Sequence, residues 1–193
     1  MVISNIEIKK IISKAYPYLS DKEMELFISI SKYYIIKNKE LIFKGGRLNK
    51  YVFFILKGNV RIYNVKDNGV ELVKHLRSEG TVCGDTSVFT EKIQTSNIEA
   101  IGETHVLKFS VDDLEKLGFN NHEMMVFYLN LLKEILLVFS YRIDSFISMT
   151  PKERYLDLVK WNPSYLDSTF DKHVASFLGI TPLTLYRIKK SIQ

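Results

Sequence analysis

The chain has 193 residues, 46% of them hydrophobic and 25% charged, with a formal net charge of +5. These values indicate a folded, soluble protein of one large domain or two small ones, and they permit an anionic partner without requiring one. The single cysteine, Cys83, excludes an internal disulfide and a cluster bound by several cysteines of one chain. The N-terminus has charges within its apolar run and no small-residue cleavage site, and no apolar run reaches about 18 residues, so we expect a cytoplasmic protein outside the membrane.

Two kinds of pattern divide the first part of the chain. Residues 4–31 place apolar side chains at helical spacing and predict a helical lead-in. From Tyr33 to Ser110 the chain changes to short β-branched and aromatic runs bounded by Gly, Asn and Asp, which predict the strands of a sandwich, roll or barrel. A turn signal at Lys57-Gly58-Asn59 is expected to separate two of these strands.

A long helix is predicted from His122 to Met149. Its apolar residues recur at steps of four and three, which is the seam of a two-stranded coiled coil. About 28 residues would extend roughly 42 Å, longer than most helices of a small core. Leu131 and Ile135 make other faces apolar too, so a core helix remains the alternative. We expect one face to pack on the strands and the other to pair with a second copy through Met125, Leu129, Leu132, Leu136, Phe139, Ile143 and Phe146.

A domain boundary is expected at Thr150-Pro151, because the residue before a proline is pushed out of helical geometry. A helix over residues 152–161 and a loop containing Pro163 should follow. The last 23 residues then resemble two short helices hinged at Gly179, which is helix-turn-helix patterning.

The second of these helices is the candidate DNA-reading element. Thr181 is placed to cap it, Pro182 suits its first position, and its outer face is basic. We assign Arg187 to a guanine contact, and assign Lys172, Lys189 and Lys190 to phosphates. Lys189 and Lys190 have the alternative of a solvated helix end. The full set of candidate DNA-binding residues is Thr181, Pro182, Leu183, Thr184, Tyr186, Arg187, Lys189, Lys190 and Lys172.

The order helix, strands, long helix, helix-turn-helix resembles the Crp/Fnr superfamily of transcription regulators. The similarity runs through residues 41–65, through TVCGDTSVF at 81–89, and through TPKERYLDLVK at 150–160 and ASFLGITPLTLYRIKK at 175–190. It implies an α+β fold in which residues 1–120 form a cyclic-nucleotide-binding-like β-roll, of double-stranded β-helix or jelly-roll type, with N-terminal helices. Residues 121–149 would be the dimerisation helix, and residues 150–193 the DNA-binding domain. The resemblance also places Gly58 in a sharp hairpin turn.

The effector pocket that the resemblance implies is degenerate. In the family, a Gly-Glu pair and a later Arg-Ser or Arg-Thr pair bind the cyclic phosphate and the ribose. Here Gly84 is kept, Asp85 replaces the glutamate, and the arginine position falls on Gln94 or Thr95. A buried phosphate would lack its cation, so we do not expect cAMP or cGMP as the effector. Two alternatives stay open for Gly84, Asp85, Thr86, Gln94, Thr95 and Ser96: a pocket for another small polar effector, or a vestigial pocket.

Metal and catalytic sites are not indicated. The four histidines are scattered without metal-ligand spacing, Cys83 is better interpreted as a buried apolar residue than as a redox sensor, and no nucleophile-base-acid set has motif spacing. We expect a homodimeric regulator that binds a pseudo-palindromic operator on double-stranded DNA, with RNA polymerase as an implied partner. In the family, a glutamate stands where this chain has Leu183, so the resemblance implies a half-site richer in A·T. The alternative is a sensing or protein-interaction dimer that no longer binds DNA.

Overall fold

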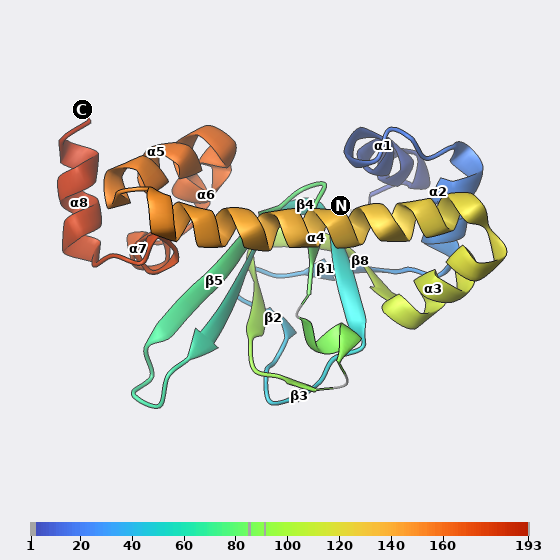
Figure 1. The fold of residues 1–193 in the computed structure, drawn as a ribbon, viewed down its shortest axis with the longest axis horizontal. Helices are drawn as coiled ribbons and strands as arrows, with labels where there is room; N and C mark the ends of the chain where they lie inside the picture. The colour runs from blue at the N-terminus through green and yellow to red at the C-terminus, as the bar shows by residue number, and fades with distance from the viewer. Residues whose placement is uncertain (1–2, 85, 91, 193) are drawn as a thin grey trace.

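The computed structural model describes residues 3–84, 86–90 and 92–192, and within them the chain is a mixed α/β fold with an antiparallel sheet (Figure 1). The α+β class expected from the sequence is confirmed. The helices are α1 (Asn5–Ala15), α2 (Asp21–Ser29), η1 (Thr86–Phe89, a 3-10 helix), α3 (Val111–Asn120), α4 (His122–Ser148), α5 (Pro151–Trp161), α6 (Pro163–Ser168), α7 (Asp171–Leu178) and α8 (Pro182–Lys190). The strands are β1 (Lys32–Ile36), β2 (Leu41–Phe43), β3 (Arg47–Leu48), β4 (Tyr51–Val65), β5 (Glu71–Ser78), β6 (Val82–Cys83), β7 (Ile93–Gln94) and β8 (Asn97–Ser110).

Two long antiparallel strands, β4 and β8, form the centre of the main sheet. Each has different neighbours at its two ends. The first half of β4 pairs with β6 and its second half with β5, while β8 pairs with β2 at its start and with β1 at its end. This exchange of partners bends the sheet around an apolar interior that includes Phe53, Ile55 and Ile98. A short second sheet joins β3 and β7.

The hairpin turn expected at Gly58 is wrong. β4 continues through this residue, and the register against β8 shifts between Ile55 and Asn59. Gly58 has a φ of +90°, and a Cβ atom there would lie 2.7 Å from the Glu103 carbonyl oxygen. A glycine therefore marks an irregularity within one long strand, where a residue with φ > 0 and no side chain is needed.

The N-terminal helices and the first half of α4 cover one face of the sheet. Phe27 of α2 packs edge-to-face against Phe54, Phe109 and Phe127, with ring centroids 5.0–6.2 Å apart. These rings are almost fully buried. Aromatic side chains from two helices and two strands thus form the main core, which fixes the start of α4 on the sheet.

The long helix α4 runs across most of the molecule (Figure 1). Met124, Phe127 and Leu131 are buried in the core, whereas most of its second half carries large apolar side chains that are exposed. By length and composition α4 would also pass for a membrane-spanning helix, with a mean hydropathy of 1.5 over its most apolar stretch, although only 17% of that stretch is buried within this structure.

The C-terminal helices α5 to α8 form a small unit beside the second half of α4, with a core of their own that includes Leu158, Val174 and Leu185. The loop expected around Pro163 is instead the short helix α6, in which Pro163 occupies the first turn. A proline there costs nothing, since the N–H groups of a first turn have no helical partner.

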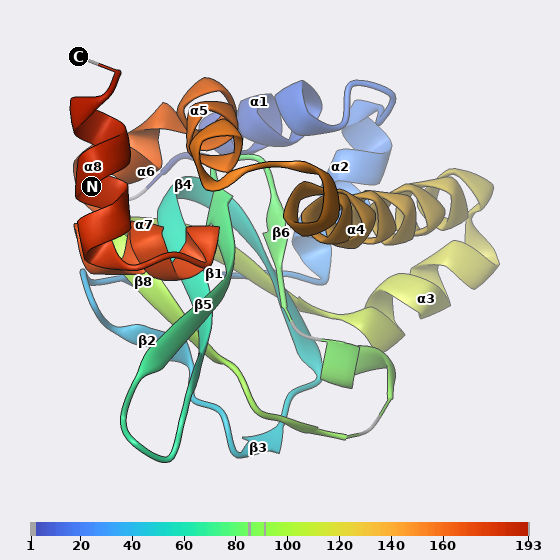
Figure 2. The same cartoon turned by 60° about the vertical axis from the view of Figure 1, so that its left-hand side comes forward.

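The C-terminal unit docks on the edge strand β5, and α7 lies beside β5 in both views (Figure 2). Tyr165 of α6 is fully buried, and its hydroxyl donates to the carbonyl oxygens of Val60, at 2.7 Å, and Arg77. The Ser176 hydroxyl on α7 accepts from the Val73 N–H at 2.9 Å. Hydrogen bonds to the sheet backbone therefore hold this unit in one orientation.

Candidate nucleic-acid interface and sensor pocket

A glycine turn joins α7 and α8. Gly179 is left-handed, with a φ of +68°, and the Ile180 N–H donates to the Ala175 carbonyl oxygen at 3.0 Å, so the turn closes the end of α7. A Cβ atom at Gly179 would lie 2.6 Å from Cε1 of Phe146, near the end of α4. Both the backbone angle and this close approach therefore require glycine.

The start of α8 is capped as the sequence indicates. The Thr181 side chain accepts from the Thr184 N–H at 3.1 Å, and Pro182 occupies the first turn. The hydroxyls of the two threonines are also 2.9 Å apart. The Thr184 hydroxyl is thus already paired with the cap, which leaves it less free for an external partner.

One face of α8 is exposed and the opposite face is buried. Leu185 and Ile188 pack inside the C-terminal unit. Leu183 and Tyr186 are 58% and 59% exposed, and Arg187 and Lys190 lie with them on the solvent side. Their spacing of three and four residues places all four on one face of the helix.

The two other candidate lysines differ from each other. Lys189 forms an ion pair with Asp171 at the start of α7, with Nζ and Oδ1 2.5 Å apart. Lys172, the next residue on α7, is exposed. Lys189 therefore links α8 to α7 through this ion pair, whether or not it also contacts a phosphate.

Of the predicted effector residues whose side chains the structure describes, Gln94 and Ser96 are buried within the protein and Thr95 is exposed, so these three do not line one cavity. Gln94 is fully buried, and its amide is used internally: Nε2 donates to the Ser96 carbonyl oxygen at 2.7 Å, and Oε1 accepts from Asn49 at 2.8 Å. Ser96 is also buried and accepts from Lys74, whereas Thr95 is exposed. Asp85 lies outside the described residues, and Thr86 is described through its backbone alone.

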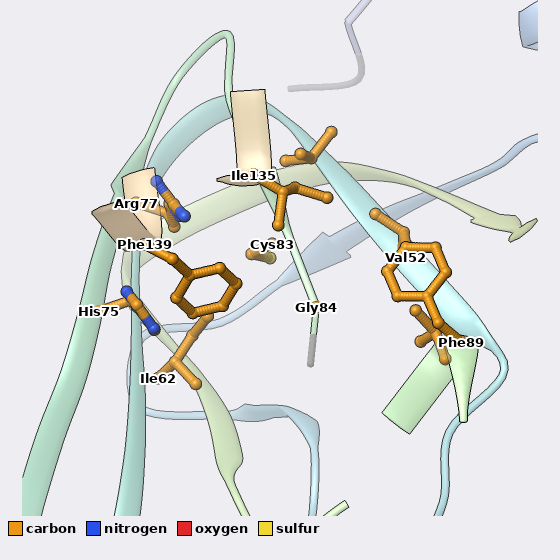
Figure 3. A pocket seen from close by; sticks show the side chains of 11 residues that line it. Val52, Ile62, His75, Arg77, Cys83, Gly84, Phe89, Ile135 and Phe139 are labelled. Atoms are coloured by element: carbon orange, nitrogen blue, oxygen red, sulfur yellow. The ribbon is translucent and has the colours of Figure 1, made fainter. Parts of the chain in front are cut away.

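Gly84 lines a small cavity between the sheet and α4 (Figure 3). The cavity has a volume of about 40 Å³, and its walls are mainly apolar, with His75, Arg77, Ile135 and Phe139 among the lining residues. Pockets that bind small organic ligands are usually about 300–1,000 Å³. This space suits a few water molecules and is too small for a nucleotide.

Cys83, His105 and His173 are buried, His75 is partly buried and His122 is exposed, and these side chains are not grouped for chemistry. Burial raises the pKa of the Cys83 thiol to about 12, which keeps it protonated. His75 and His105 lie in strands, and His173 packs against Arg61, whose guanidinium is 3.0 Å from its Nδ1. Among the described residues, no three His, Cys, Asp or Glu side chains form a group able to hold a metal ion.

The predicted seam on α4 divides into two sets. Leu129, Leu136 and Ile143 are exposed, at heptad spacing along one face. Phe139 is partly covered, and its ring lies edge-to-face with His75 at 5.1 Å. Phe146 is stacked by Arg142 of α4 and Arg154 of α5, whereas Met125 and Leu132 are half-buried.

Arg142 and Arg154 are site residues that the sequence pattern did not predict. Their guanidinium carbons lie 4.3 Å and 4.7 Å from the centroid of the Phe146 ring. Arg154 also donates to the carbonyl oxygens of Leu178 and Met149, at 3.1 Å and 2.7 Å. These contacts connect α4 to the turn before α8, and the only sequence signal was the placement of two arginines near the ends of apolar helices.

Comparison with known proteins agrees with this architecture. Residues 35–121 match the family described as the cyclic nucleotide-binding domain. Among curated proteins, lysophospholipase nte1 of Neurospora crassa is 27% identical over 74 residues, which are 38% of this chain and only 5% of that protein. The matched segment is thus a small part of nte1, and the rest of that enzyme has no counterpart in the match.

Solved structures extend the similarity to nearly the whole chain. FixK2 from Bradyrhizobium japonicum has a TM-score of 0.70 at 17% identity, over 84% of each chain. The c-di-GMP-responsive global regulator CLP from Xanthomonas campestris has a TM-score of 0.68 at 16% identity, over 90% of this chain and 92% of CLP. The catabolite activator protein of Thermus thermophilus gives 0.56 at 18% identity, over 92% and 85%. Residues 35–121 therefore have the cyclic nucleotide-binding domain fold. The chain as a whole has the fold of Crp/Fnr-type regulators.

Proposed function

We propose that this chain is a homodimeric, sequence-specific DNA-binding transcription regulator of Crp/Fnr type that acts in the cytoplasm and catalyses no reaction. The observation that carries the proposal is the exposed face of α8, held rigidly by the Gly179 turn and the Thr181 cap. Leu183, Tyr186 and Arg187 project from this face, where a major groove could receive them.

Charge supports a nucleic-acid partner. From Thr150 to the end the chain has seven Lys or Arg against four Asp or Glu, so this region holds +3 of the total +5. Arg187 would contact a guanine, while Lys172 and Lys190 would contact phosphates on either side. Leu183 can offer only apolar contact, for example to a thymine methyl group, which favours a half-site richer in A·T.

The exposed heptad of α4 supports a homodimer. Leu136 and Ile143 are 68% and 60% exposed, and a second copy would cover them in a coiled-coil seam. Two α8 helices related by the dimer axis would then read half-sites about 34 Å apart on a pseudo-palindrome. RNA polymerase is the further partner that such a regulator implies.

Cyclic nucleotides are not proposed as the effector. The position where the family has arginine is a buried glutamine whose amide is already hydrogen-bonded, and the nearby cavity is about 40 Å³. Isothermal titration calorimetry with cAMP or cGMP should detect no binding tighter than about 100 μM. A low-micromolar dissociation constant would refute this part of the proposal.

The DNA-binding proposal is tested by selecting bound duplexes from a random pool and then measuring affinity for the selected site. Arg187→Ala should weaken that affinity by about 1–3 kcal/mol, the usual value of a bidentate base contact. Arg47→Ala is the matched control, because Arg47 is exposed on β3 and lies outside the C-terminal unit. A chain that selects no sequence, or an Arg187→Ala variant with unchanged affinity, would favour a sensing dimer that does not bind DNA.

A further inference from the structure

A large groove lies between the sheet, α4 and the C-terminal unit, separate from the predicted effector residues. Its volume is about 740 Å³, within the range of small-molecule sites. Its walls come from β5, from the second half of α4 and from helices α5 to α7. A molecule bound there would contact all three parts of the fold at once.

The groove contains three arginines that form no ion pair within the described residues, although the Arg77 cation is near enough to Glu134 to lower the pKa of that carboxyl. Arg77, Arg142 and Arg154 line it, and no carboxylate of the described residues lies within ion-pair distance of any of them. The Nε atom of Arg77 is buried with no hydrogen-bond partner in that same set. Burial, and to a lesser degree the Arg154 cation, lower the pKa of Arg142 to about 10, so it stays charged at neutral pH.

The two carboxylates of the groove are already engaged by tyrosines. Glu134 accepts a hydrogen bond from the Tyr16 hydroxyl at 3.1 Å, and Asp157 accepts one from the Tyr141 hydroxyl. Burial raises the pKa of Glu134, and the Tyr16 hydrogen bond and the Arg77 cation oppose this shift only in part. The groove therefore has an excess of cationic groups, which favours an anion.

The remaining lining is largely apolar and the groove is elongated. Leu76, Leu137, Val138 and Phe177 are among its walls. Its residues on α4 extend from Glu134 to Ser145, roughly 16 Å at the usual rise per residue. A ligand with a long apolar chain and one anionic end would match both the elongated shape of the groove and its cationic charge.

A second copy paired along α4 would leave this groove open. The groove residues Glu134, Val138, Tyr141 and Ser145 each lie two positions after a seam residue, namely Leu132, Leu136, Phe139 and Ile143. Two positions correspond to about 200° around an α-helix. The groove and the exposed seam residues Leu129, Leu136 and Ile143 therefore lie on opposite sides of α4, while Phe139 and Phe146 contact groove residues through His75, Arg142 and Arg154. A small molecule fits the groove better than the partner's helix does.

We propose that this interdomain groove binds an acyl-chain carboxylate, with the carboxylate at Arg142 and Arg154 and the chain along the apolar wall of α4. The bound molecule would bridge the sheet, α4 and the C-terminal unit and so stabilise the docked position of α8. An effect on DNA affinity follows only if the proposed DNA-binding function holds. Binding itself is measured without DNA, so the two proposals can fail separately.

Trp161 provides a direct readout, because it is the only tryptophan of the chain, lines the groove and is 72% exposed. The full chain is titrated with dodecanoate below its micelle concentration while tryptophan emission is recorded. We expect a saturable blue shift, since the acyl chain would remove the indole from water. Dodecanol and dodecyltrimethylammonium have the same chain without the anion and should bind at least about tenfold more weakly, the value of one charge-assisted hydrogen bond.

Two neighbouring leucines supply matched variants. Leu136 and Leu137 are both 68% exposed on α4, but only Leu137 lines the groove. Leu137→Glu places a charge on the apolar wall that the acyl chain would cover and should weaken dodecanoate binding about tenfold or more, whereas Leu136→Glu should leave it unchanged. Arg154→Ala should weaken binding by a similar factor, with a thermal melt to verify folding.

Three results would overturn the proposal. The first is the absence of a saturable shift with dodecanoate, and the second is equal binding of dodecanoate and dodecanol. The third is a Leu137→Glu variant that binds as tightly as the native chain. A loss of dimerisation in Leu136→Glu with dodecanoate binding intact would support the separation of seam and groove.

Discussion

Gly179→Ala should destabilise the chain in two separable ways. The first is the backbone: Gly179 has a φ of +68°, and a left-handed residue with a Cβ costs about 1–2 kcal/mol. The second is a clash, because the new Cβ would lie 2.6 Å from Cε1 of Phe146, about 0.8 Å short of the 3.4 Å of ordinary contact. The helix α8 begins three residues later, so the strain falls directly on the candidate DNA interface.

The free-energy cost of the clash depends on the contacts that keep the Phe146 ring in place. Its ring lies 4.3 Å and 4.7 Å from the guanidinium carbons of Arg142 and Arg154, and moving it disturbs both contacts. Each cation–π contact at a partly exposed site contributes about 0.5–1 kcal/mol. The steric part is therefore about 1–2 kcal/mol, and Gly179→Ala should lower the free energy of unfolding by about 2–4 kcal/mol in all.

Gly69→Ala is the matched control, measured by urea denaturation alongside Gly179→Ala. Gly69 has a similar φ of +79°, but nothing lies within 4 Å of its Cβ position, so only the backbone cost remains. In a Phe146→Ala background, Gly179→Ala should lose its steric part and match Gly69→Ala. Equal costs of the two glycine substitutions in the native background would show that the Phe146 contact does not constrain the turn.

Two further predictions concern buried groups. Burial raises the pKa of the Cys83 thiol to about 12, so a thiol reagent at pH 8 should modify the chain only after unfolding; rapid modification of the native chain would contradict this. Burial and the Arg61 cation lower the pKa of His173 below that of the unfolded chain, so the unfolded state binds the extra proton and stability should fall as the pH drops below about 6.5. Urea denaturation across pH 5–7 should show a shallower pH dependence for His173→Gln, and identical slopes would exclude this histidine as the cause.

The local patterns around Gly179 were sufficient to predict α7 and α8. Gly179, Thr181 and Pro182 each have a backbone preference that acts within one turn, and the structure uses all three as expected. The same short-range pattern gave a wrong prediction at Pro163, where a loop was expected and the structure has the helix α6. A proline that ends one helix can also begin the next. At Gly58 the sequence pattern predicts a hairpin turn, but within the long strand β4 this glycine, with a φ of +90°, accompanies a register shift instead.

Long-range contacts determine the roles of several residues that the sequence patterns did not predict correctly. Gln94 was a candidate for ligand binding, yet its amide pairs with Asn49, which is 45 residues away. Arg154 lines the same groove as Arg77 and Arg142 only because the C-terminal unit docks beside β5 and α4, and no local spacing encodes that docking. Residues whose roles depend on tertiary packing cannot be found from periodicity alone.

The position of Tyr165 has a consequence for how the chain can be divided. Its ring is fully buried, and its hydroxyl hydrogen-bonds to two carbonyl oxygens of the sheet. A fragment that ended at Thr150 would expose those carbonyl oxygens and the apolar wall of α4 to water. The folding of residues 1–149 and the folding of the C-terminal helices are therefore energetically linked, and the two halves should unfold in a single transition.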